Sequence, residues 1–163
     1  MLEQTNLLDK IQEYRAIQPD DLNMAATKRN VSDLMYAYEV EVYRAGGRIE
    51  PKVTPSYSIM PPSFGNGFHS STESSALDNL EKHEMVELFF NKITLGLNSI
   101  DCVLDADRKG RRRKMFVMRY IQSKSRQQIM EELAIEKTAY HEDMNMAVTQ
   151  FAYELGLHVK LKF

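Results

Sequence analysis

The chain has 163 residues, of which 43% are hydrophobic, so it is long enough to bury the core of one domain or two very small ones. A single cysteine, Cys102, excludes an internal disulfide framework and a zinc site built from cysteines. The N-terminus lacks the basic start and apolar run of a signal peptide. No window approaches the roughly 18 apolar residues of a membrane-spanning helix. These features predict a cytoplasmic protein with no membrane partner.

Charge is divided unevenly along the chain. Residues 1–107 carry 9 basic and 17 acidic side chains, a net charge of −8, whereas residues 108–163 carry 12 and 6, a net charge of +6. The first part would repel a polyanion and the second would attract it. The charge therefore directs any nucleic-acid interaction to the C-terminal third.

Apolar spacing predicts two helices in residues 1–46. The first carries a stripe at Leu7, Leu8, Ile11, Tyr14 and Ile17. The second runs roughly from Asp21 to Ala45, and its stripe comprises Val31, Leu34, Tyr38, Val42 and Ala45. A helical hairpin of this kind needs a partner to bury its outer face, so residues 1–46 are predicted to support self-association into a homo-oligomer.

Residues 47–75 are predicted to form an irregular linker. Residues 46–75 hold four of the seven glycines and four of the five prolines. Nearly thirty residues without periodicity are uncommon inside a compact domain, so this segment is interpreted as a linker, a partner-binding segment or both.

A long helix of about thirty residues is expected to follow, capped by Ser74 or Ser75 and ending near Asp107. Its buried side is marked by Leu77, Leu80, Phe89 or Phe90, Ile93, Leu97, Ile100 and Leu104. Cys102 lies in this apolar helical stretch and is interpreted as a small buried hydrophobe. Gly110 is expected to separate the helix from a basic C-terminal unit, and residues 76–163 form the third predicted region.

Residues 111–157 have the spacing of a helix-turn-helix module. Ser125 and Gln128 form a capping-box pattern at the start of a short helix. The turn 134–137 leads to Thr138, the expected N-cap of a last helix that Gly156 ends. Its inner face carries Tyr140, Met144, Ala147 or Val148, Phe151 and Leu155. A short helix, a tight turn and a longer helix are the parts that place a recognition helix in the major groove, although plain three-helix bundles share them.

A basic run precedes this module and comprises Arg108, Lys109, Arg111, Arg112, Arg113 and Lys114. The dipole at a helix N-terminus disfavours cations, so contact with phosphates is one reason for their presence, and a solvated charged turn is the other. The last helix has no Lys or Arg after its start but carries Glu142 and Asp143, which are expected near DNA and would meet phosphate repulsion. Glu142 could accept from a cytosine and Asn145 could pair with an adenine. His141 has no second His or Cys at ligand spacing, so neither a metal nor another cofactor is expected.

Two segments resemble the ArpU family of phage-encoded transcriptional regulators, which includes RinA-type activators. They are "YIQSKSRQQIMEELAIEKTAYHEDMNMAVTQFAYELGLHV" and "KVTPSYSIMPPSFGNGFHSSTESSA", and together they cover roughly residues 51–160. The resemblance implies an all-α protein in the bacterial host cell, with a last domain similar to the promoter-reading domain of sigma factors, that activates phage late genes. It also implies that the groove-facing residues are Thr138, Ala139, His141, Glu142 and Asn145. The basic run, Ser125 and Lys137 complete the set of candidate DNA-binding residues.

The leading hypothesis is a transcriptional regulator that binds double-stranded DNA through its C-terminal unit. One alternative is a DNA-packaging component, similar to a small terminase, in which the module only tethers an oligomer to DNA. Another is a regulator whose acidic helix binds RNA polymerase instead of DNA. An enzyme is not expected, because the sequence has no Gly-rich phosphate loop and no recognisable nucleophile–base pair.

Overall fold

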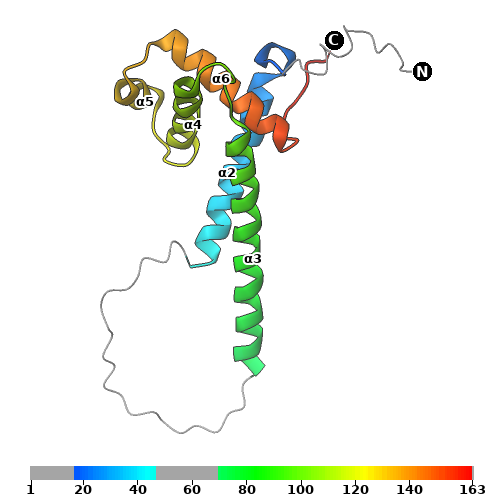
Figure 1. Ribbon diagram of the computed structural model, residues 1–163. Helices are drawn as coiled ribbons and strands as arrows, with labels where there is room; N and C mark the ends of the chain where they lie inside the picture. Colours follow the sequence, from blue (N-terminus) through cyan, green and yellow to red (C-terminus); the bar gives the residue numbers. More distant parts are fainter. Residues whose placement is uncertain (1–16, 47–69, 163) are drawn as a thin grey trace, which may run out of the picture. The chain divides into compact units, whose positions relative to one another are not determined.

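The computed structural model describes residues 17–46 and 70–162 (Figure 1). These residues form a 3-10 turn, η1 (Pro19–Asp21), and the helices α2 (Met24–Arg44), α3 (Ser70–Ser99), α4 (Ala106–Tyr120), α5 (Arg126–Leu133) and α6 (Lys137–Glu154). Within these ranges there is no β-strand, only an isolated bridge between Leu22 and Lys160. The predicted all-α class is therefore confirmed for the described part of the chain. The first predicted helix of the N-terminal hairpin and most of the predicted linker lie outside it.

The described residues group into two compact units, and each is treated by itself. One unit contains residues 17–35 and 92–162, which include the start of α2, the end of α3 and all of α4, α5 and α6. The other contains residues 36–46 and 70–91. Every residue proposed from the sequence to bind DNA belongs to the first unit.

The core of the first unit is built around α6, which packs against α4 and η1, while α5 packs against α4 (Figure 1). Phe116 of α4 and Phe151 of α6 are fully buried, with ring centroids 4.4 Å apart. Most of the inner face predicted for α6 is confirmed, because Tyr140, Met144, Ala147, Val148 and Phe151 are all buried. Apolar residues at helical spacing thus fix which side of α6 faces inward.

The start of α2 is tied to the C-terminal segment of the chain. The Asn23 side chain accepts from the amide of Ala26 at 3.1 Å and so caps the helix. Thr27 is completely buried, and its hydroxyl accepts from the amide of Val159 at 3.0 Å. The amide of Asn23 donates to the carbonyl of Val159 at 2.8 Å. These bonds hold residues 157–161 along the first turns of α2.

The second unit leaves large apolar side chains in solvent. Tyr36 and Tyr43 of α2 are exposed, as are Met85, Leu88 and Phe90 of α3. In the same part of α2, Glu41 and Arg44 form an ion pair at 2.8 Å. Among the described residues of α6, by contrast, Tyr153 is the one large apolar side chain that is exposed.

Several predicted boundaries are wrong by one to two helical turns. The long helix begins at Ser70 rather than at a cap on Ser74 or Ser75, and it ends at Ser99 rather than near Asp107. Residues 100–105 form a connection that contains half-buried Cys102, which is therefore not helical, and Leu104 is 97% exposed. Gly110 separates nothing, because it lies inside α4 with open space around it. The sequence pattern missed this break because apolar residues continue through Val103 and Leu104.

The local signals around α5 are largely confirmed. Ser125 caps α5, and a reciprocal capping box joins it to Gln128. Ala134 ends α5 in the left-handed conformation, with φ of 49°, and Gly156 follows α6 with φ of 69°. Thr138 is not the N-cap of α6; that position belongs to Glu136, whose side chain makes no capping bond.

Candidate nucleic-acid interface

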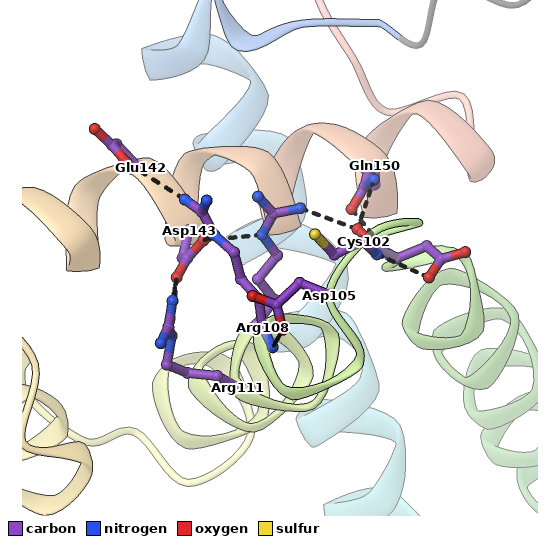
Figure 2. Close-up of polar contacts among 9 residues, drawn as sticks. Cys102, Asp105, Arg108, Arg111, Glu142, Asp143 and Gln150 are labelled. Atoms are coloured by element: carbon purple, nitrogen blue, oxygen red, sulfur yellow. Dashed lines mark hydrogen bonds and ion pairs between the residues drawn. The ribbon is translucent and has the colours of Figure 1, made fainter.

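The basic run lies in the first half of α4, a helix that begins one turn earlier than the sequence predicts. Asp105 precedes the helix and accepts from the amide of Arg108 at 2.8 Å, which satisfies one of the free N–H groups at the helix start. From this helix, the side chains of Arg108 and Arg111 extend toward α6, as Figure 2 shows.

Three of these arginines converge on one carboxylate, Asp143 of α6, which is completely buried. Arg108 Nε lies 2.6 Å from Asp143 Oδ1, and Arg112 Nε lies 3.0 Å from the same oxygen. Arg111 uses a fork, with Nε at 3.0 Å and Nη2 at 2.6 Å from Asp143 Oδ2. Arg108 Nη2 also reaches Glu142 Oε2 at 3.3 Å (Figure 2). These five residues are called the Asp143 cluster below.

The Asp143 cluster settles the charge of its central acid. Burial by itself would raise the pKa of Asp143, but hydrogen bonds from Arg108, Arg111 and Arg112 outweigh it and hold the pKa below its ordinary value. The hydrogen bond between Arg108 and Asp143 also raises the pKa of Arg108. Asp143 is thus a buried, ionised acceptor on the inner side of α6, and the expectation that it faces DNA is wrong.

The remaining arginine of the run secures the end of α3. Arg113 donates from Nε to the carbonyl of Ile100 at 2.9 Å and from Nη2 to the carbonyl of Asn98 at 2.8 Å. These carbonyls lie where a helix leaves acceptors without partners, so a cation there completes the helix end. Lys109 pairs with the Asp101 carboxylate at 3.0 Å, and this pair lowers the pKa of Asp101.

Gln150 of α6 holds the same connection from the other side. Its Oε1 accepts from the amide of Asp101 at 3.1 Å, and its Nε2 donates to the carbonyl of Asp101 at 3.1 Å. Arg112 Nη1 donates to that carbonyl as well, at 3.0 Å. The loop between α3 and α4 is therefore fixed to α6 by a single amide side chain and one buried guanidinium.

The first turns of α6 present a different surface. Lys137, Thr138 and Glu142 are exposed, and Ala139 and His141 are half-buried. The Glu142 side chain is 62% exposed. This face is adjacent to the Asp143 cluster, because Glu142 belongs to both.

Asn145, the last residue expected to face the groove, is bonded within the protein. Its Oδ1 accepts from Lys28 Nζ of α2 at 2.7 Å, and partial burial lowers the pKa of Lys28. A bidentate pair with adenine needs both the oxygen and the amide nitrogen of an asparagine. The Lys28 bond uses one of the two lone pairs of Asn145 Oδ1, so an adenine pair would share this oxygen with Lys28.

The other candidate residues lie at the margins. Lys114 is exposed on α4, and Ser125 is occupied by its capping role at α5. The structure thus brings Arg108, Arg111 and Arg112 together with Asp143 and Glu142 near the start of α6. Arg113 and Lys109 instead bind the end of α3 and the connection that follows it.

Two phage proteins are similar to this chain along most of their length. This chain is 30% identical to the uncharacterized phage-related protein Lin1259/Lin1739 of Listeria innocua over 139 residues. The matched region covers 85% of this chain and 93% of that protein. The chain belongs to the family of that phage-related protein. Protein Gp66 of Listeria phage A118 is 28% identical over 142 residues, covering 87% of this chain and 93% of Gp66. No protein-family model and no solved structure matches the chain.

Sequence reasoning missed three positions that join elements of the first unit in this member of the phage-related family. From the sequence, Asp143 is expected near DNA, although it lies three residues after Tyr140 and four before Ala147, both on the inner face. That spacing was the available signal. Lys28 and Gln150 gave no such signal, because their partners lie 117 and 49 residues away in the chain.

Two further observations concern membranes and metals. In the ranges that the structure covers, no helix combines the length and apolarity needed to span a bilayer. The same residues contain no group of three or more His, Cys, Asp or Glu side chains arranged to hold a metal ion.

Proposed function

We propose that this phage-related protein is a DNA-binding transcriptional regulator that is not an enzyme, and that α5 and α6 form a helix-turn-helix whose second helix enters the major groove. The observation that carries the proposal is the exposed start of α6, which directly follows an eight-residue α5 and a left-handed turn at Ala134. Lys137, Thr138 and Glu142 supply a cation, a hydroxyl and an acceptor there.

The burial of Asp143 supports DNA binding by α6 over the alternative in which this helix binds RNA polymerase. From the sequence, Glu142 and Asp143 are both expected near phosphates, but of these two acids only Glu142 meets solvent. The neighbouring guanidiniums of Arg108 and Arg111 are about one-third exposed and offset that single charge. The first turns of α6 are therefore less repulsive to DNA than their sequence suggests, which weakens the case for RNA polymerase as the direct partner of this helix.

The regulatory role itself rests on the phage family and on the ArpU resemblance. Phage-related membership is compatible with activation of late genes and equally with a packaging role. Exposed Thr138 and Glu142 at the start of α6 offer groups that can bond to base edges, which favours regulation, because a tether needs backbone contacts alone. A homo-oligomer would supply a second half-site to such a regulator.

A selection of bound duplexes from random DNA by the full-length protein tests the proposal. We expect an enriched motif. Glu142→Gln should change the preferred base at one position, a discrimination of about 1–3 kcal/mol. Glu154→Gln removes the same charge from the far end of α6 and should leave the motif unchanged. Uniform retention would favour the packaging alternative, and no retention would contradict DNA binding and leave RNA polymerase as the partner to examine.

A further inference from the structure

The Asp143 cluster contains more positive charge than its buried acid requires. Arg112 is 7% exposed and by itself supplies the buried counter-charge that Asp143 needs. Arg108 and Arg111 add two further guanidiniums, and only Glu142 offsets them. A cluster that served the core alone would not need these two half-exposed cations.

The guanidiniums of Arg108 and Arg111 are each bonded to a carboxylate along one edge, and their other edge has N–H donors left for a further acceptor. Arg111 uses Nε and Nη2 for Asp143, and Arg108 uses Nε for Asp143 and Nη2 for Glu142. A guanidinium has five N–H donors. Among the described residues, no acceptor is found for Nη1 of either arginine. The Arg108 side chain is 33% exposed and the Arg111 side chain is 35% exposed.

An arginine fixed in this way loses little freedom when it binds a second anion. Long side chains usually lose rotamer entropy on binding, and a bond that already fixes the side chain reduces this cost. The open edge of a guanidinium matches two oxygens of a phosphate. The Arg108–Glu142 contact places this edge beside the exposed start of α6.

We propose that Asp143 is a positioning residue that orients Arg108 and Arg111 to bind phosphates of the DNA backbone, whereas Arg112 and Arg113 serve the fold. This inference rests on the proposed function, and it divides a basic run that appears uniform in sequence. Phosphate contacts of this kind fix the register of a recognition helix and carry no sequence information of their own.

The proposal reverses the effect expected from charge alone. Removing an acid near DNA should tighten binding by Coulomb's law, and Glu142→Gln follows that rule on a duplex of random sequence. Asp143→Asn removes the same charge one residue further on, but it also releases Arg108 and Arg111. We therefore expect Asp143→Asn to weaken binding and Glu142→Gln to tighten it.

The experiment measures the affinity of the full-length protein for one random-sequence duplex at several salt concentrations, with folding verified by circular dichroism. The double variant Arg108→Gln/Arg111→Gln should weaken the salt dependence. The negative slope of log K against log salt should become smaller in magnitude by about 1.8, since each lost phosphate contact removes about 0.9. Lys160→Gln/Lys162→Gln removes two cations from the exposed C-terminal segment and should lower the slope by less than half as much.

A charge-conserving variant keeps the test decisive if Asp143→Asn does not fold. Arg111→Lys preserves the charge but loses the fork on Asp143, so it should weaken DNA binding. Arg119→Lys is the same change on an exposed arginine of α4 and should have little effect. Suppose that the wild-type protein binds DNA with a clear salt dependence. The positioning role alone would then be overturned by any of three results: tighter binding by Asp143→Asn, normal binding by Arg111→Lys, or an unchanged salt slope in the double variant. Wild-type protein that does not bind DNA would overturn the proposed function as well.

Discussion

The two ends of α6 are held by opposite kinds of contact. At its start, a buried carboxylate binds three guanidiniums from α4. Toward its end, Phe151 packs on Phe116 and lies so close to Gly96 of α3 that no side chain fits between them. The charged end depends on protonation and bond geometry, and the apolar end depends on volume. The same helix therefore combines a charged end with an apolar end, and the two ends respond to different kinds of substitution.

The largest expected effect is at the charged end. Asp143→Asn should lower the free energy of unfolding by about 3 kcal/mol, because three arginines lose an ionised acceptor and Arg112 is left buried. Glu142→Gln should change it by less than about 0.5 kcal/mol, because that side chain is largely exposed. Urea unfolding of the three proteins measures the difference. Equal stabilities would contradict the role of Asp143 in joining α4 to α6.

Acid should abolish this difference. The folded-state pKa of Asp143 lies below its ordinary value of 3.8, so its stabilisation is complete above that value and is lost as the pH falls through the folded-state pKa. Urea unfolding of wild-type protein and Asp143→Asn should therefore differ fully at neutral pH and converge as the pH falls well below about 3.8. A constant difference down to the lowest pH at which both fold would argue against an ionised Asp143.

The apolar end should respond to a single methyl group. A Cβ at Gly96 would lie 2.5 Å from Phe151 Cε2 and 3.1 Å from Leu155 Cδ1, so Gly96→Ala should destabilise by about 1–3 kcal/mol through overpacking. Gly110→Ala is a matched control, because this helical glycine of α4 has open space around it. It should stabilise by about 0.5–1 kcal/mol. Thermal unfolding gives the sign of both, and a stabilised Gly96→Ala would contradict the close packing.

The sequence predicted the apolar end much better than the charged end. Ala147 and Phe151 recur at helical spacing, so one local pattern places them inside. The Ser125 capping box and the turn at Gly156 are equally local. These signals need no knowledge of any other helix.

The charged end could not be worked out in the same way. Whether Arg111 faces phosphate or a carboxylate depends on Asp143, which lies 32 residues later in the chain. The break between α3 and α4 was hidden because Val103 and Leu104 continue an apolar pattern although both are exposed. Long-range pairing of charges and solvent-exposed apolar residues are therefore the two features that the sequence alone left undetermined.

Hydrogen exchange of the full-length protein with and without duplex DNA tests directly whether the start of α6 recognises DNA. The first amides of a helix lack intrahelical partners, so a duplex bound there should slow their exchange. We expect DNA-dependent protection at residues 125–128 and 137–142 and in the first two turns of α4. Protection confined to residues 36–46 and 70–91, or no change anywhere, would contradict recognition of DNA by the start of α6.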